Sequence, residues 1–76
     1  MEALQLLQQG DWVGAHTIAV ADDSRLGSWL HGIVHLAKLD EANARYWYGE
    51  ADRTYPGPDG LEAEIAALQR AFVLLV

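Results

Sequence analysis

Three histidines are the side chains of this sequence best suited to chemistry. His31 and His35 stand four residues apart in a segment with helical periodicity, so both imidazoles share one face within reach of one metal ion. His16, on the preceding predicted helix, is a candidate third ligand. Carboxylates that would complete the shell belong to Asp11, Asp40 and Glu50. The pattern predicts a site for a divalent transition metal such as zinc.

The alternative is that these histidines are surface residues or line a helical hairpin. Helical periodicity places His31 and His35 nearly opposite the apolar face of their helix, away from the core. No glutamate lies between them, which argues against a zincin-type hydrolase. If the site is catalytic, a histidine would act as general base, and Tyr46 or Asn43 would orient the substrate.

Three consecutive aromatic residues follow in the next predicted helix. Neighbouring positions of a helix point about 100° apart, so Tyr46, Trp47 and Tyr48 cannot all face the core. Trp47 and Tyr48 lie on the side that carries the small residues, which predicts a packing role. Tyr46 points away, beside Asn43 and Glu50, which predicts a binding surface. The alternative is a tyrosine that a neighbouring helix half covers while its hydroxyl stays in water.

The elements that position these residues are helical throughout. Glycine, proline and capping residues separate five segments with helical periodicity. Gly10 is expected to end the first helix, while Asp11, Asp40 and Asp59 are expected to cap later ones. The expected helices are Glu2–Gln9, Trp12–Ala21, Arg25–Lys38, Glu41–Ala51 and Leu61–Leu75. We therefore predict one all-α domain over residues 1–76, with a linker-like loop at 55–60.

Small residues and one aromatic recur through the central segment, from Ser24 to Ala51. Gly32, Ala44 and Ala51 would let two antiparallel helices approach closely, with Tyr48 filling the groove between them. This spacing resembles the tetratricopeptide pattern of paired helices. It predicts about five helices in stacked antiparallel hairpins of tetratricopeptide-like type.

The chain also resembles a family of small bacterial all-helical proteins with no assigned function. The family pattern is a tryptophan and an Ala-His pair, then Trp-x-His-x-x-x-His, then Asn-Ala-x-Tyr-Trp-Tyr. This chain has it at Trp12, Ala15-His16, Trp29 to His35 and Asn43 to Tyr48. The resemblance implies one constellation made of His16, His31, His35, Asn43, Tyr46 and Trp47. The chain departs from the pattern at Lys38-Leu39-Asp40, where the family has an acidic residue, glycine and aspartate, and this predicts a slightly different turn.

Charge and composition exclude several classes of partner. The net charge is −6, and the five basic residues are scattered, so we expect neither nucleic-acid binding nor attraction to an anionic membrane. No segment approaches the roughly 20 apolar residues of a membrane span. The absence of cysteine and of a recognisable signal peptide predicts a cytoplasmic protein.

Two functions remain open on these grounds. The first is a protein-interaction or self-associating module, suggested by the hairpin, the acidic surface and the apolar run at residues 71–76. That run would either pack on the hairpins or form a contact surface. The second is a metal or small-ligand site built from His16, His31, His35, Asn43 and Tyr46. The first needs no cofactor, whereas the second implies zinc or a similar ion.

Overall fold

Five α-helices and one short 3-10 helix make up the described chain. The computed structural model describes residues 2–22 and 24–75, and within these ranges the side chains of all residues except 2, 4 and 72–75. Within the described ranges no strand occurs, which confirms the all-α prediction. In chain order the elements are α1 (Glu2–Gln8), α2 (Trp12–Val20), α3 (Arg25–Ala37), α4 (Glu41–Glu50), η1 (Pro58–Gly60) and α5 (Leu61–Leu75).

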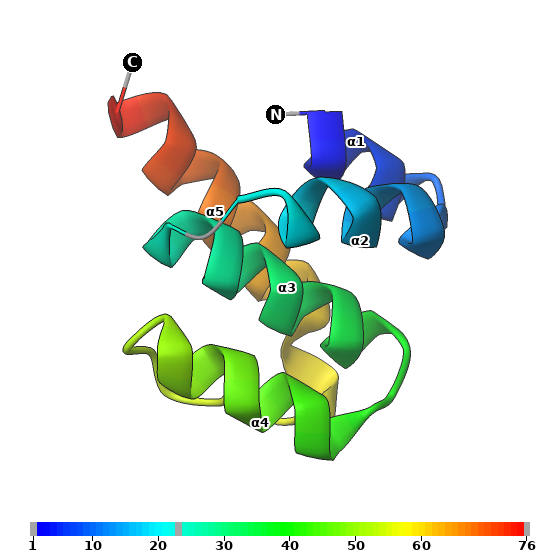
Figure 1. The fold of residues 1–76 in the computed structure, drawn as a ribbon, viewed down its shortest axis with the longest axis vertical. Coiled ribbons are helices and arrows are strands. Elements are labelled where there is room, and N and C mark those ends of the chain that lie inside the picture. The colour runs from blue at the N-terminus through cyan, green and yellow to red at the C-terminus, as the bar shows by residue number, and fades with distance from the viewer. Residues whose placement is uncertain (1, 23, 76) are drawn as a thin grey trace.

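The helix α3 is the centre of the molecule. It contacts each of the other four α-helices, with α2 and α4 on either side and α5 behind it in the view of Figure 1. Every residue from Trp29 to Leu36 is buried, which is more than two full helical turns. Other helices therefore cover α3 on most sides along this run, whereas its first turn remains partly exposed.

This burial corrects the sequence-based placement of two histidines. Helical periodicity placed His31 and His35 away from the core, yet only 6% and 8% of their surfaces are exposed. Periodicity identifies the apolar face of a helix, but it does not show whether a neighbouring helix covers the opposite face. Here α2 and α4 cover it, so the surface alternative for these two side chains is wrong.

The helices begin where capping residues satisfy their first backbone amides. The side chains of Asp11, Ser24 and Asp40 accept from the amides three residues ahead, at 2.9, 3.1 and 3.4 Å. At their C-terminal ends the helices stop within one residue of the positions that the sequence predicted. Asp59, which was expected to cap the last helix, lies inside η1, and Gly60 separates it from the first residue of α5.

Three helices end in the same backbone turn. After α1, α3 and α4, the residues Gly10, Leu39 and Asp52 have φ angles of 82°, 61° and 59°. In each turn the next amide donates to the carbonyl five residues back, as when Asp40 donates to His35 at 2.9 Å. Leu39 thus adopts the left-handed conformation that glycine takes most readily.

Close approach of α3 and α4 depends on Gly32. A Cβ atom at this position would lie 2.7 Å from a ring carbon of Tyr48, which is fully buried. Ala44 and Ala51 on the same face of α4 are also buried. The expected packing of small residues around Tyr48 is therefore present in this hairpin.

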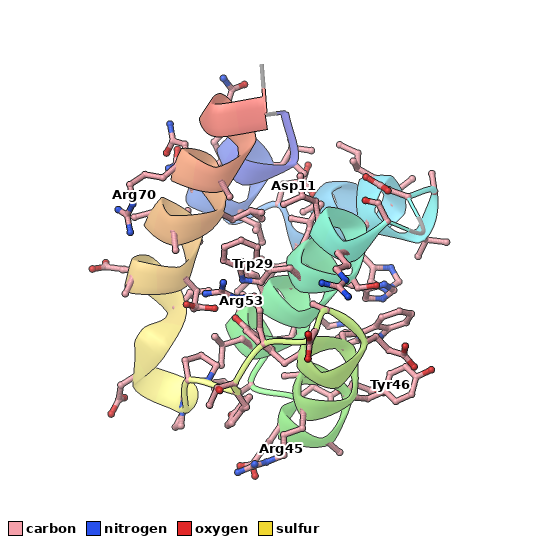
Figure 2. The ribbon with its side chains drawn as sticks, turned by 90° about the vertical axis from the view of Figure 1, so that its left-hand side faces the viewer. Asp11, Trp29, Arg45, Tyr46, Arg53 and Arg70 are labelled. Carbon is pink, nitrogen blue, oxygen red and sulfur yellow. The ribbon has the colours of Figure 1, made fainter. Side chains whose placement is uncertain are left out.

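A polar network attaches α5 to the rest of the core. The indole Nε1 of Trp29 donates to Glu64 Oε1 at 3.0 Å, and Arg53 Nη2 donates to Glu64 Oε2 at 3.3 Å. The guanidinium of Arg53 also lies 3.6 Å from the centre of the Trp29 ring, between α3 and α5 in Figure 2. Leu68 of α5 is fully buried. The helices α2 and α4 cover other sides of α3.

The C-terminal prediction concerns residues 71–76, of which Ala71 alone has a described side chain. Ala71 is partly buried and packs against the core. The side chains of residues 72–76 lie outside the described ones, so whether the rest of this run packs back or forms a contact surface stays a prediction. Within residues 2–22 and 24–75, no helix combines the length and apolar character needed to cross a bilayer.

The unusual backbone of Leu39 gives a testable stability effect. Its side chain is 79% exposed, so replacement removes little packing. We expect Leu39→Gly to raise the free energy of unfolding by about 0.5–1 kcal/mol, because glycine adopts positive φ without the Cβ clash. Leu39→Ala keeps the Cβ atom and is the matched control, for which we expect little change. Urea denaturation of the three proteins measures the difference, and equal effects of Gly and Ala would contradict the explanation.

Candidate functional site

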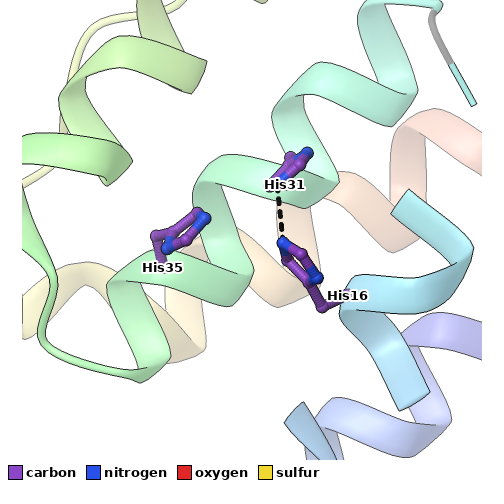
Figure 3. A group of neighbouring side chains, drawn as sticks. All are labelled: His16, His31 and His35. Atoms are coloured by element: carbon purple, nitrogen blue, oxygen red, sulfur yellow. Dashed lines mark hydrogen bonds between the residues drawn. The ribbon is translucent and has the colours of Figure 1, made fainter. Parts of the chain in front are cut away.

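The three histidines converge at the junction of α2 and α3. His16 comes from α2, whose small residues Ala15 and Ala19 are buried on either side of it in the sequence. His31 and His35 are one turn apart on α3 and face the same side, as their spacing predicted. One ring nitrogen from each histidine lies within 4.8 Å of one from each of the others. The cluster and its shortest contact, between Nε2 of His31 and Nε2 of His16 at 2.9 Å, are drawn in Figure 3.

The three rings adopt two orientations. His31 and His35 are nearly parallel, with 9° between their planes and 5.2 Å between their centres. The ring of His16 stands almost perpendicular to both, at 86° and 84°. The crossing ring of His16 thus brings a nitrogen close to nitrogens of both stacked rings.

The surroundings of the cluster keep two of its imidazoles neutral. The pKa of His31 is lowered from 6.5 to about 4. Burial is the main cause, and the neighbouring His16 and His35 contribute the remainder. Burial also lowers the pKa of His35, although Asp40 opposes this effect. A neutral imidazole has one nitrogen with a free lone pair, which is the form that binds metals.

A carboxylate supports His35 from the side. The Nδ1 atom of His35 is buried and has no hydrogen-bond partner, and Oδ2 of Asp40 lies 3.5 Å from it. The same oxygen accepts from Nδ2 of Asn43 at 2.7 Å. If Nδ1 carries the proton and faces Asp40, the other nitrogen of His35 is free to bind a ligand. Asn43 is exposed and holds Asp40, so it acts on the cluster through that carboxylate.

The other histidine of α3, His31, is covered by Trp47, which in turn contacts Tyr46. The half-buried ring of Trp47 stacks on His31, with 3.9 Å between centres and 7° between planes. Tyr46 meets Trp47 edge-on at 5.0 Å and is 57% exposed, projecting from α4 in Figure 2. A hydrogen bond to Glu50 raises the pKa of the Tyr46 hydroxyl. The outward direction of Tyr46 is as predicted, and the packing partner of Trp47 is a histidine.

The carboxylates predicted to complete a metal shell do not join the histidines. Within the described part of the chain, the group of potential ligand atoms contains the three histidines alone. Asp11 caps α2, and Asp40 lies beside His35. Glu50 lines a groove next to the cluster together with Asp22, a residue that the sequence pattern did not single out. Asp22 lies in the turn after α2, and helical periodicity does not predict where the side chain of a turn residue lies in space.

The buried imidazoles make stability depend on pH. The pKa of His31 in the fold, about 4, lies below its ordinary 6.5, so the unfolded chain binds this proton more tightly. The stabilisation is present above pH 6.5 and is lost as the pH falls towards 4. We expect the free energy of unfolding to fall on the order of 2 kcal/mol across this window from His31, with His35 adding to it.

Urea denaturation at intervals between neutral pH and pH 4 measures this loss. The variant His31→Phe keeps a planar ring against Trp47 but cannot titrate, so its stability should fall less across the same window. The lowered pKa values of Asp22 and Asp40 affect stability mainly near and below pH 3.8, at the acid end of the window, and they act in both proteins. Equal losses in the two proteins would show that His31 is not the responsible group.

Comparisons with known proteins give no information about the function of this site. Comparison of the chain with known protein families, with curated proteins and with solved structures finds no match. The functional assignment therefore rests on the geometry of the three histidines and of the residues that hold them.

Proposed function

We propose that this domain binds a divalent transition metal, with zinc as the first choice, through His16, His31 and His35. The observation that carries the proposal is the meeting of three imidazole nitrogens from two helices within 4.8 Å of one another. Imidazole nitrogens are favoured ligands of zinc, copper and nickel. A cluster of three imidazoles in a largely apolar interior is expensive to desolvate, and metal coordination would offset that cost.

Zinc binding would require the nitrogens to move in two senses: the closest pair would separate, and pairs up to 4.8 Å apart would approach one another by as much as about 1.5 Å. Tetrahedral ligands at ordinary Zn–N distances lie roughly 3.3 Å apart. The contact between His16 and His31 is 2.9 Å, so their Nε2 atoms would separate by roughly half an ångström as the metal replaces the hydrogen bond. His16 is only partly buried and has room to make this movement.

Three histidines leave one position of a tetrahedral ion open. Such sites carry a water molecule or a bound ligand in the fourth position, whereas closed structural sites use four protein ligands. The contact between His35 and Asp40 matches the carboxylate–histidine arrangement that orients metal-bound imidazoles. These features favour an accessible metal site over a purely structural one.

Zinc titration tests the proposal directly. We expect one zinc ion per chain at neutral pH, with a rise in melting temperature of more than about 5 °C at saturating zinc and its reversal by chelator. Replacing His16, His31 or His35 by Gln should weaken binding by at least about 100-fold, because each removes one of three ligands. Isothermal titration calorimetry measures the affinity. Binding that survives loss of His16 would contradict the three-histidine site.

A matched pair of cap variants tests the supporting carboxylate. Asp40→Asn and Asp11→Asn both keep a side chain that caps a helix well, but only Asp40 lies beside His35. We expect Asp40→Asn to weaken zinc binding by about 10-fold or more, and Asp11→Asn to leave it unchanged. An equal effect of the two variants would attribute any loss to helix stability.

The exposed apolar residues of α2 favour a second candidate function. Trp12, Val13 and Val20 are 43%, 78% and 62% exposed. Such a surface suits contact with an amphipathic helix, either of another protein or of a second copy of this chain. On this view the stacked hairpins are a tetratricopeptide-like interaction module, as the sequence suggested.

Light scattering at increasing protein concentration tests the self-associating form of this candidate. We expect the mean mass to rise above that of a monomer between micromolar and millimolar concentration. Val13→Asp should restore the monomer, since a charge at the contact disfavours burial. Leu39→Asp is the control, because Leu39 is equally exposed but lies in the turn between α3 and α4. A monomer at every concentration would exclude self-association.

A further inference from the structure

A groove lies beside the histidine cluster and is not explained by metal binding. Its volume is about 410 Å³, within the usual range for small-molecule sites. Its floor is α3, and its sides come from the end of α2, the turn that follows it, and α4. The lining side chains are those of Ala19, Val20, Asp22, Ser28, His31, Tyr46, Trp47 and Glu50.

One side of the groove is aromatic and held in place. Trp47 is fixed by its stack on His31, and Tyr46 is fixed against Trp47 by an edge-on contact. Tyr46 is more than half exposed, so the arrangement is open to a ligand. The faces of indole and phenol rings carry negative electrostatic potential and attract organic cations.

The charged side chains of the groove have one sign. Asp22 and Glu50 are its ionisable carboxylates, and no lysine or arginine lines it. Among the described residues, neither carboxylate has a cationic side chain within 4.0 Å. The amide of Ser24 donates to Asp22 at 2.9 Å, which favours the ionised form of that carboxylate. The negative charge of the groove is therefore not neutralised within the described chain.

We propose that this groove binds a small organic cation, an alkylated or primary amine with a short apolar body. Its ammonium group would lie against the rings of Tyr46 and Trp47, within reach of Asp22 and Glu50. Its apolar part would contact Val20 on the facing helix. Aromatic faces combined with carboxylates select for cations, while anions are repelled by the same groups. The inference requires no metal, so it goes beyond the proposed zinc site.

Two pairs of probes of matched shape test the proposal on chelator-treated protein. Choline is compared with 3,3-dimethylbutan-1-ol, and butylamine with butan-1-ol, each pair differing in charge while nearly equal in shape. Nuclear magnetic resonance follows the indole N–H signals of the three tryptophans. We expect at least one cation to shift the Trp47 signal while the buried Trp29 signal stays in place. We also expect its neutral counterpart to bind at least about fivefold more weakly.

Four variants then assign the binding to named groups. Tyr46→Phe keeps the ring and should preserve binding, whereas Tyr46→Leu removes it and should weaken binding about three- to fivefold. Glu50→Gln should weaken binding to a similar degree, and Glu62→Gln, an exposed carboxylate on α5, should not. The proposal is overturned if both cations bind no better than their neutral counterparts. It is also overturned if Tyr46→Leu and Glu50→Gln both leave binding unchanged. Because no metal is present, neither outcome bears on the zinc site.

Discussion

The burial of α3 from Trp29 to Leu36 is the constraint on which the rest of this structure depends. A chain of 76 residues has little interior, and here one helix occupies its centre. Two of the side chains on that helix are imidazoles, which lose hydration when they are buried. Their surroundings compensate with a partner ring from α2, a carboxylate beside His35 and an indole over His31. The contacts that form the candidate site are therefore the same ones that offset the desolvation of the two buried imidazoles.

The turns and small residues place those compensating groups. Gly32 allows α4 to approach α3, which brings Trp47 over His31. The left-handed conformation of Leu39 then turns the chain so that Asp40 donates its amide to the His35 carbonyl and places its carboxylate near the His35 ring. One backbone turn thus ends α3, caps α4 and supports a candidate metal ligand.

The sequence predicted most of the helix bounds and the meeting of three histidines in the candidate site, because helix ends and the spacing of His31 and His35 leave signals close together in the chain. Helix ends follow from Gly10, Asp11 and Asp40, and the shared face of His31 and His35 follows from their spacing of four. The burial of these two histidines could not be predicted, since it depends on how α2 and α4 pack. The conformation of Leu39 was missed for a related reason, because leucine rarely adopts positive φ and nothing in its type indicates it. Asp22 became part of a groove only through the path of the chain in space.

The two proposed sites share His31, on which Trp47 of the groove stacks, so their occupancies are physically linked. Three neutral imidazoles add no negative charge, and a divalent ion bound to them would keep its full charge of about two positive units beside the groove. That charge would oppose an ammonium ion held near Asp22 and Glu50, while the same carboxylates would attract a metal ion approaching from solvent. The coupling is reciprocal by thermodynamic necessity, so a bound organic cation would lower the affinity for the metal by the same factor. Trp47 lines the groove and stacks on His31, so a ligand in the groove would lie close to a candidate metal ligand and within range of the charge of a bound metal.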